Sequence, residues 1–137
     1  MKIVLDANVF ISSFFWSGNP RAVLERVIAG IDALFVTKEI LDEIEEVIGR
    51  PKFHTSKDEI QYYINSIEEI ASKITPKSRI QNARRDASDN KYIECGITAG
   101  ADYIVSGDIH LLELRKYGGI EMVSPKDYLA IVKRPAR

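Results

Sequence analysis

Three aspartates follow or precede regular segments of the chain at places suited to chemistry. Asp6 follows the apolar run 2–5, and Asp108 comes shortly after the apolar run 103–105. Asp89 comes just before a helical pattern. In open parallel sheets, ligands bind beyond the carboxyl ends of the strands, so the three carboxylates are expected at one edge. Carboxylates that converge repel one another and persist together where a cation compensates their charge.

A simpler interpretation gives each aspartate a local structural role. Asp6 or Asn8 could cap the following helix, Asp89 could be another N-cap, and Asp108 could be an ordinary turn residue. For each residue alone this interpretation is favoured, because capping and turn aspartates are common. For the three together it weakens, because neighbouring carboxylates need compensation.

A fourth acidic candidate lies on the helix expected after Thr37. The apolar stripe of that helix consists of Ile40, Leu41, Ile44, Val47 and Ile48. Glu43 and Glu45 lie at opposite margins of the stripe, from where a side chain can reach inward. Periodicity alone does not choose between them, and a solvated helix face is the simpler interpretation for both.

The donor set indicates which metal such a site would take. Oxygen ligands without histidine or cysteine select hard cations, here Mg²⁺ or Mn²⁺. Such a cation activates water for attack on a phosphodiester and neutralises charge on the phosphate. His54 and His110 are isolated, so zinc is not expected. The single cysteine, Cys95, falls in an apolar helix and excludes an intrachain disulfide or a CxxC site.

Two other phosphate chemistries fit the residues less well. A phosphatase with an aspartyl nucleophile at Asp6 would need a second aspartate two positions later, where Asn8 stands. A phosphoacceptor signalling domain would need a lysine after a later strand, and the segment 106–108 does not supply it. Both are therefore disfavoured.

Alternating strands and helices must position these residues. Strands are expected at 2–5, 33–36, 73–75, 103–105 and 120–123. Helices are expected at 9–16, 20–29, 38–48, 57–70, 92–99, 109–114 and 125–132, with Asn19 as the N-cap of the second. This alternation predicts an α/β fold with a central parallel sheet and helices on both faces.

The chain of 137 residues is expected to form a single domain at 1–132, followed by a basic tail at 133–137. Its net charge of −1 does not by itself indicate a nucleic-acid binder, but four acids committed to metal would leave a mildly basic remainder. The first apolar run is too short for a signal peptide, and no stretch approaches the ~18 apolar residues of a membrane span. We expect a soluble, cytoplasmic protein.

Four segments, taken together and in order, resemble the PIN-domain nucleases, especially the VapC-like toxin ribonucleases. They are IVLDANVF at 3–10, LDEIEEVIGRPKF at 41–53, DASDNKYIEC at 86–95 and ADYIVSGD at 101–108. Any one of them is a weak signal, but the set spans nearly the whole chain. The resemblance implies a three-layer α/β/α sandwich and cleavage of single-stranded RNA. It also implies an antitoxin partner and a homodimer, as in many members.

The resemblance also assigns roles to individual residues. The four acidic positions of the family fall on Asp6, Glu43, Asp89 and Asp108. The resemblance selects Glu43 over Glu45, because Glu43 stands before the segment RPKF at the spacing found in the family. Asn8 and Ser106 match small polar positions that support the metal ligands, and Asp86 is placed to assist the third acid.

Remaining features concern substrate and partners. Arg79, Arg84 and Arg85 lead towards the third acid and are predicted to hold RNA phosphates. The aromatic run 14–16 fits core packing, or alternatively a dimer or antitoxin surface. The alternative function from another class is a non-catalytic RNA-binding or scaffold domain with a PIN-like fold.

Overall fold

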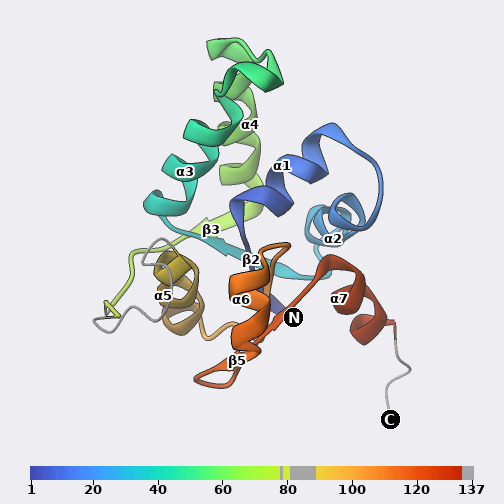
Figure 1. Ribbon diagram of the computed structural model, residues 1–137, viewed down its shortest axis with the longest axis vertical. Coiled ribbons are helices and arrows are strands. Elements are labelled where there is room, and N and C mark those ends of the chain that lie inside the picture. The colour runs from blue at the N-terminus through green and yellow to red at the C-terminus, as the bar shows by residue number, and fades with distance from the viewer. Residues whose placement is uncertain (78, 81–88, 134–137) are drawn as a thin grey trace.

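The protein is described here by a computed structural model that covers residues 1–77, 79–80 and 89–133. Within these residues the chain forms one six-stranded sheet between layers of helices, which confirms the predicted α/β/α sandwich (Figure 1). The strands are β1 (Lys2–Leu5), β2 (Ala33–Val36), β3 (Ala71–Lys73), β4 (Tyr103–Val105), β5 (Lys116–Tyr117) and β6 (Ile120–Val123). The helices are α1 (Ala7–Phe15), α2 (Asn19–Ile28), α3 (Lys38–Ile48), η1 (Pro51–Phe53), α4 (Lys57–Ile70), α5 (Asn90–Ala99), α6 (Ile109–Leu114) and α7 (Pro125–Val132).

The sheet has its topological switch point between β1 and β4. The strand order is β3-β2-β1-β4-β6-β5, so the chain leaves β1 for β2 and β3 on one side and later places β4 on the other. β1 and β4 are parallel, with Leu5 opposite Val105. The residues that follow both strands therefore emerge together at the edge where open α/β sheets bind ligands.

The two central strands, β1 and β4, are apolar because helices cover both of their faces. Ile3, Val4, Leu5, Ile104 and Val105 are all fully buried, as expected of parallel strands covered on both faces. Helix α5 packs against β1, β2 and β4, whereas α2 packs against α7. Figure 1 shows these helices on the two sides of the sheet, with α3, η1 and α4 projecting at one end.

The predicted starts of α3, α4, α6 and α7 are confirmed, whereas α1 and α5 each begin two residues earlier than predicted. Thr37 accepts a hydrogen bond from the backbone N–H of Ile40, and Ser56 forms a capping box with Glu59. At α2 the prediction was off by one residue: Gly18 is the N-cap, and Asn19 is already helical. Glycine tolerates the φ of 129° found at this position.

Two strand predictions need correction. β3 begins directly where α4 ends and covers 71–73, not 73–75. β5 was not predicted, and it makes the sheet mixed because it pairs antiparallel with β6. The two strands are joined by Gly118 and Gly119, whose φ values of 56° and 87° fit a tight hairpin turn that favours glycine. A two-residue strand is too short to show alternation in sequence.

Among the helices of the described residues, none combines the length and the apolar composition that a membrane span requires.

Candidate functional site

Asp6 lies at the carboxyl end of β1 and is almost completely buried, with 3% of its surface exposed. Its Oδ1 accepts a hydrogen bond from the backbone N–H of Val9 at 2.8 Å and thereby caps α1. Its Oδ2 accepts hydrogen bonds from the hydroxyl of Ser106 and from the backbone N–H of Gly107, the latter at 3.3 Å. The capping interpretation is thus correct for one oxygen, while the other faces the end of β4.

Burial raises the pKa of the Asp6 carboxyl, and the negative charge of Asp108 raises it further, in spite of the three hydrogen bonds that lower it. Among the described residues, the hydrogen-bond partners of Asp6 are neutral donors. None of the described residues thus supplies a compensating positive charge through a hydrogen bond to Asp6, and a cation beside the carboxylate would supply that charge.

Ser106 joins the ends of β1 and β4. Its side chain is fully buried. The hydroxyl donates to Asp6 and accepts from the backbone N–H of Asp108 at 2.9 Å. Asp108 in turn caps α6, because its Oδ1 accepts from the backbone N–H of His110 at 2.8 Å. The structure therefore brings Asp6 and Asp108 to the same edge, as the strand-end argument predicted.

Glu43 is connected to the same edge through Tyr92 of α5. The Tyr92 hydroxyl donates to Glu43 Oε2 at 2.9 Å and accepts from the backbone N–H of Ala7 at 3.1 Å. Burial and the neighbouring carboxylates raise the pKa of Tyr92, so its hydroxyl stays protonated as a donor. Of the two glutamates left open by periodicity, Glu43 is half-buried here and Glu45 is exposed.

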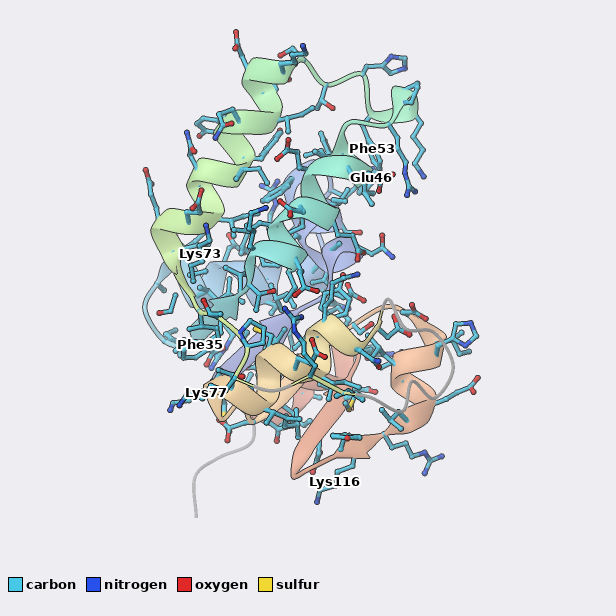
Figure 2. All side chains as sticks on the ribbon, turned by 90° about the vertical axis from the view of Figure 1, so that its left-hand side faces the viewer. Phe35, Glu46, Phe53, Lys73, Lys77 and Lys116 are labelled. Carbon is cyan, nitrogen blue, oxygen red and sulfur yellow. The ribbon has the colours of Figure 1, made fainter. Side chains whose placement is uncertain are left out.

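Lys91, the residue before Tyr92, also contacts Glu43. Its ammonium forms an ion pair with Glu43 Oε1 and lies 5.5 Å from the centre of the Tyr92 ring. Neither residue was singled out from the sequence, although both lie two and three positions after Asp89 within the segment 86–95. Figure 2 views the molecule from the side on which α3 and α5 meet.

The structure places the other predicted site residues as follows. Asp89 is at the N-cap position of α5, half-buried, with helical backbone angles of −77° and −19°. Asn8 is exposed in the first turn of α1. Asp86, Arg84 and Arg85 lie outside the described residues, so their predicted roles remain predictions.

Arg79 is held by two carboxylates. It forms ion pairs with Glu39 of α3 and with Glu94 of α5, the latter at 3.1 Å, and these raise its pKa. The second Glu94 oxygen accepts from the backbone N–H of Ile80 at 2.8 Å. This arrangement ties the segment before α5 to both helices. The predicted contact of Arg79 with RNA would require its guanidinium to exchange or share these partners.

The aromatic run after the first site divides between the two predicted environments. Phe14 stacks on Tyr63 with ring centres 4.6 Å apart, and Phe15 stacks on Phe53 at 5.4 Å. Trp16, by contrast, is 58% exposed. Phe14 and Phe15 therefore pack within the chain, and the surface alternative applies to Trp16.

The donors at this edge fit a hard divalent cation in type. Carboxylates, a serine hydroxyl and a tyrosine hydroxyl supply oxygen, whereas His54 and His110 are exposed and Cys95 is buried in the core. Burial raises the pKa of the Cys95 thiol to about 12, which leaves it inert. Among residues 1–77, 79–80 and 89–133, however, no three acidic, histidine or cysteine side chains stand close enough together to hold a metal ion. At Glu43 the positive charge comes from Lys91.

Comparisons with known proteins agree with this fold. The family model for the PIN domain matches residues 2–110, so the chain belongs to the PIN domain family, whose members are generally nucleases. No curated protein matches the chain. Among solved structures, a chain of VapBC2 from Rickettsia felis, bound to a DNA fragment from their promoter, is similar with a TM-score of 0.61 and 12% identity. The alignment covers 89% of this chain and 97% of that one.

Proposed function

We propose that this PIN domain is a Mg²⁺- or Mn²⁺-dependent endoribonuclease that cleaves single-stranded RNA through metal-activated water. The observation that carries the proposal is the connection of Asp6, Asp108 and Glu43 through Ser106 and Tyr92 at the switch point of the sheet. Membership of a family of nucleases supports the hydrolytic chemistry.

In this proposal Asp6, Glu43, Asp89 and Asp108 hold the metal, and the chain prepares these side chains for it. A bound divalent cation would supply positive charge to the phosphodiester and lower the pKa of a water molecule. Ser106 fixes one oxygen of Asp6 and the backbone of Asp108. Because both carboxylates also cap helices, their positions are set by the backbone, which favours preorganisation.

The proposed partners follow from the same family membership. RNA is the proposed substrate, and Arg79, Arg84 and Arg85 are its proposed phosphate contacts. Similarity to a chain of VapBC2 supports a toxin that is blocked by an antitoxin protein. A homodimer and a cytoplasmic location complete the proposal, as does one PIN-like domain at 1–132 with a basic tail at 133–137.

The decisive test uses two glutamates of the same helix. Glu43→Gln removes a proposed ligand, while Glu45→Gln makes the same change at an exposed position and serves as the matched control. We expect Glu43→Gln, Asp6→Asn and Asp89→Asn each to lower cleavage of a labelled single-stranded RNA in Mn²⁺ by at least about a hundredfold. Glu45→Gln should cleave like the wild type. If the wild type leaves the RNA intact in both Mg²⁺ and Mn²⁺, the proposal is wrong for that substrate.

The alternative function is a non-catalytic RNA-binding or scaffold domain. The ion pair between Lys91 and Glu43 favours it, because one proposed ligand is already neutralised by the chain itself. A thermal titration separates the two functions. Mn²⁺ should raise the melting temperature of a metal-dependent enzyme, and a scaffold domain would bind RNA without cleaving it and show no such rise.

A further inference from the structure

We propose that Lys91 is an internal cation that holds the Glu43 carboxylate in the metal-free protein and competes with the divalent metal for it. This inference rests on the proposed function, because it concerns the same carboxylate. It assigns to Lys91 a positioning role that tunes metal affinity.

The geometry shows that α5 engages both oxygens of Glu43. Lys91 pairs with Oε1, and the neighbouring Tyr92 donates to Oε2 at 2.9 Å. Tyr92 is itself anchored to the backbone of Ala7, next to Asp6, at 3.1 Å. Glu43 is therefore drawn towards the edge with Asp6 by a neutral donor on one oxygen and by a positive charge on the other.

The ion pair between Lys91 and Glu43 is shielded from solvent, so its charges can affect metal binding. Only 16% of the Lys91 side chain and 30% of the Glu43 side chain are exposed. Charges in such a setting are screened less than on an open surface. A divalent cation that approaches Oε1 would meet the ammonium at short range, and the two positive charges repel. The metal must therefore displace Lys91 from Oε1, or bind with its charge close by.

Lysine is suited to this exchange. Its ammonium is a point charge on a flexible stem, so it can leave an oxygen without disturbing the helix that carries it. Arg79, a cation that contacts both α3 and α5, is already paired with Glu39 and Glu94. Those pairs hold the two helices together independently. Release of Lys91 thus need not separate α3 from α5.

Substitutions of Lys91 and Tyr92 should affect metal binding in different ways. Lys91→Met keeps an unbranched apolar stem and removes the charge, so it removes the competitor. Tyr92→Phe loosens Glu43 but leaves the charge in place. Lys91→Arg keeps the charge and serves as the matched control. Lys91→Gln removes the charge but retains a hydrogen-bond donor, and it replaces the methionine variant if that variant does not fold.

The experiment is calorimetric titration of the metal-free proteins with MnCl₂, with folding checked by circular dichroism. We expect Lys91→Met to have a lower melting temperature without metal and to bind Mn²⁺ about tenfold more tightly than the wild type, because a nearby positive charge is gone. Lys91→Arg should bind like the wild type, and Tyr92→Phe should bind no more tightly than it.

The outcomes separate this inference from the function on which it rests. Unchanged or weaker Mn²⁺ binding by both Lys91→Met and Lys91→Gln, with normal binding by the wild type, would leave the metal site standing and overturn the competition. Lys91 would then be a structural link between helices. No Mn²⁺ binding by any variant or by the wild type would overturn the metal site itself, and with it the competition.

Discussion

At the scale of single residues, Asp6 has two tasks that usually fall to different side chains. One oxygen caps α1 through the N–H of Val9, and the other accepts hydrogen bonds from Ser106 and Gly107. Burial then raises the pKa of the carboxyl, with the negative charge of Asp108 adding to the effect. Without a bound cation, the charged form of Asp6 is therefore less favourable in the folded protein than in water. A buried carboxylate of this kind lowers the stability of the fold, a cost that is common at functional sites.

Asp6→Asn should consequently stabilise the metal-free protein. Loss of a buried charge is expected to raise the melting temperature by about 3 °C, or ~1 kcal/mol for a chain of this size. The gain is limited because the new NH₂ group would face the N–H of Gly107. Thermal unfolding followed by circular dichroism measures the change, with the exposed Asp42→Asn as control. A lower melting temperature for Asp6→Asn than for the wild type would contradict the charge argument.

At the scale of elements, the site depends on how closely α5 approaches the sheet. Asp89, Lys91 and Tyr92 all belong to its first turn or its N-cap. A Cβ on Gly96 would lie 3.0 Å from Ile120 and 3.6 Å from Ile104, the side chains of β6 and β4 beneath it. Glycine at this position lets the helix pack tightly against the strands. That packing brings Tyr92 within reach of both Ala7 and Glu43.

Gly96→Val should therefore push α5 away from the sheet. We expect a loss of about 1–3 kcal/mol in the free energy of unfolding, the usual cost of overpacking a core. Gly96→Ala is the graded control, because its tight contact with Ile120 is offset by a gain in helix propensity of about 1 kcal/mol. Urea unfolding measures both variants. Equal stability of valine and alanine variants would show that α5 is not closely packed at this point.

At the scale of the whole molecule, a cluster of charged groups around the buried Asp32 lies at the amino ends of β1 and β2, opposite the edge that carries Asp6. The Asp32 carboxylate accepts hydrogen bonds from Arg26 at 2.8 Å, from the Tyr128 hydroxyl at 2.7 Å and from the N-terminal ammonium of Met1 at 3.3 Å. Asp32 is 4% exposed, and Tyr128 is fully buried. The cluster joins α2, the start of β2, α7 and the N-terminus. Here the buried carboxylate has cationic partners, whereas the described hydrogen-bond partners of Asp6 are neutral.

Asp32→Ala should destabilise the fold by about 1–3 kcal/mol, because it leaves the buried Tyr128 hydroxyl without its acceptor and Arg26 without its ion-pair partner. Burial alone would raise the pKa of Asp32, but hydrogen bonds from Arg26, Tyr128 and the N-terminus outweigh it and lower the pKa below 3.8. Its stabilisation is thus present above pH 3.8 and is lost as pH falls through the lower, folded-state pKa. Denaturant unfolding at pH 7 and at acid pH measures this change.

The exposed Asp42→Ala is the matched control for Asp32, since it breaks a surface ion pair with Lys38. It should change the free energy of unfolding by less than about 1 kcal/mol. A stability difference between the wild type and Asp32→Ala that stays constant, or grows, as the pH falls below 3.8 would argue against the charged cluster.

Local patterns in the sequence were enough to predict the layered α/β fold, most helix starts and the position of Asp6 and Asp108 at the strand ends. Apolar runs, capping residues and glycines act on their immediate neighbours, so their effect can be seen in a window of a few residues. Short segments without such a pattern, such as the two residues of β5, were not predicted. Periodicity likewise left Glu43 and Glu45 equivalent.

Tertiary structure decided the contacts that join distant parts of the chain. The bond from Tyr92 to Glu43 spans 49 positions, that from Ser106 to Asp6 spans 100, and that from Tyr128 to Asp32 spans 96. Whether a buried carboxylate meets a neutral hydroxyl or a positive charge depends on which helix face packs against it. The sequence by itself therefore determined that Asp6 and Asp108 follow the ends of two neighbouring strands. The packing of α5 and α7 decided that Lys91 neutralises Glu43, that Arg26 and Tyr128 satisfy Asp32, and that the described partners of Asp6 are neutral.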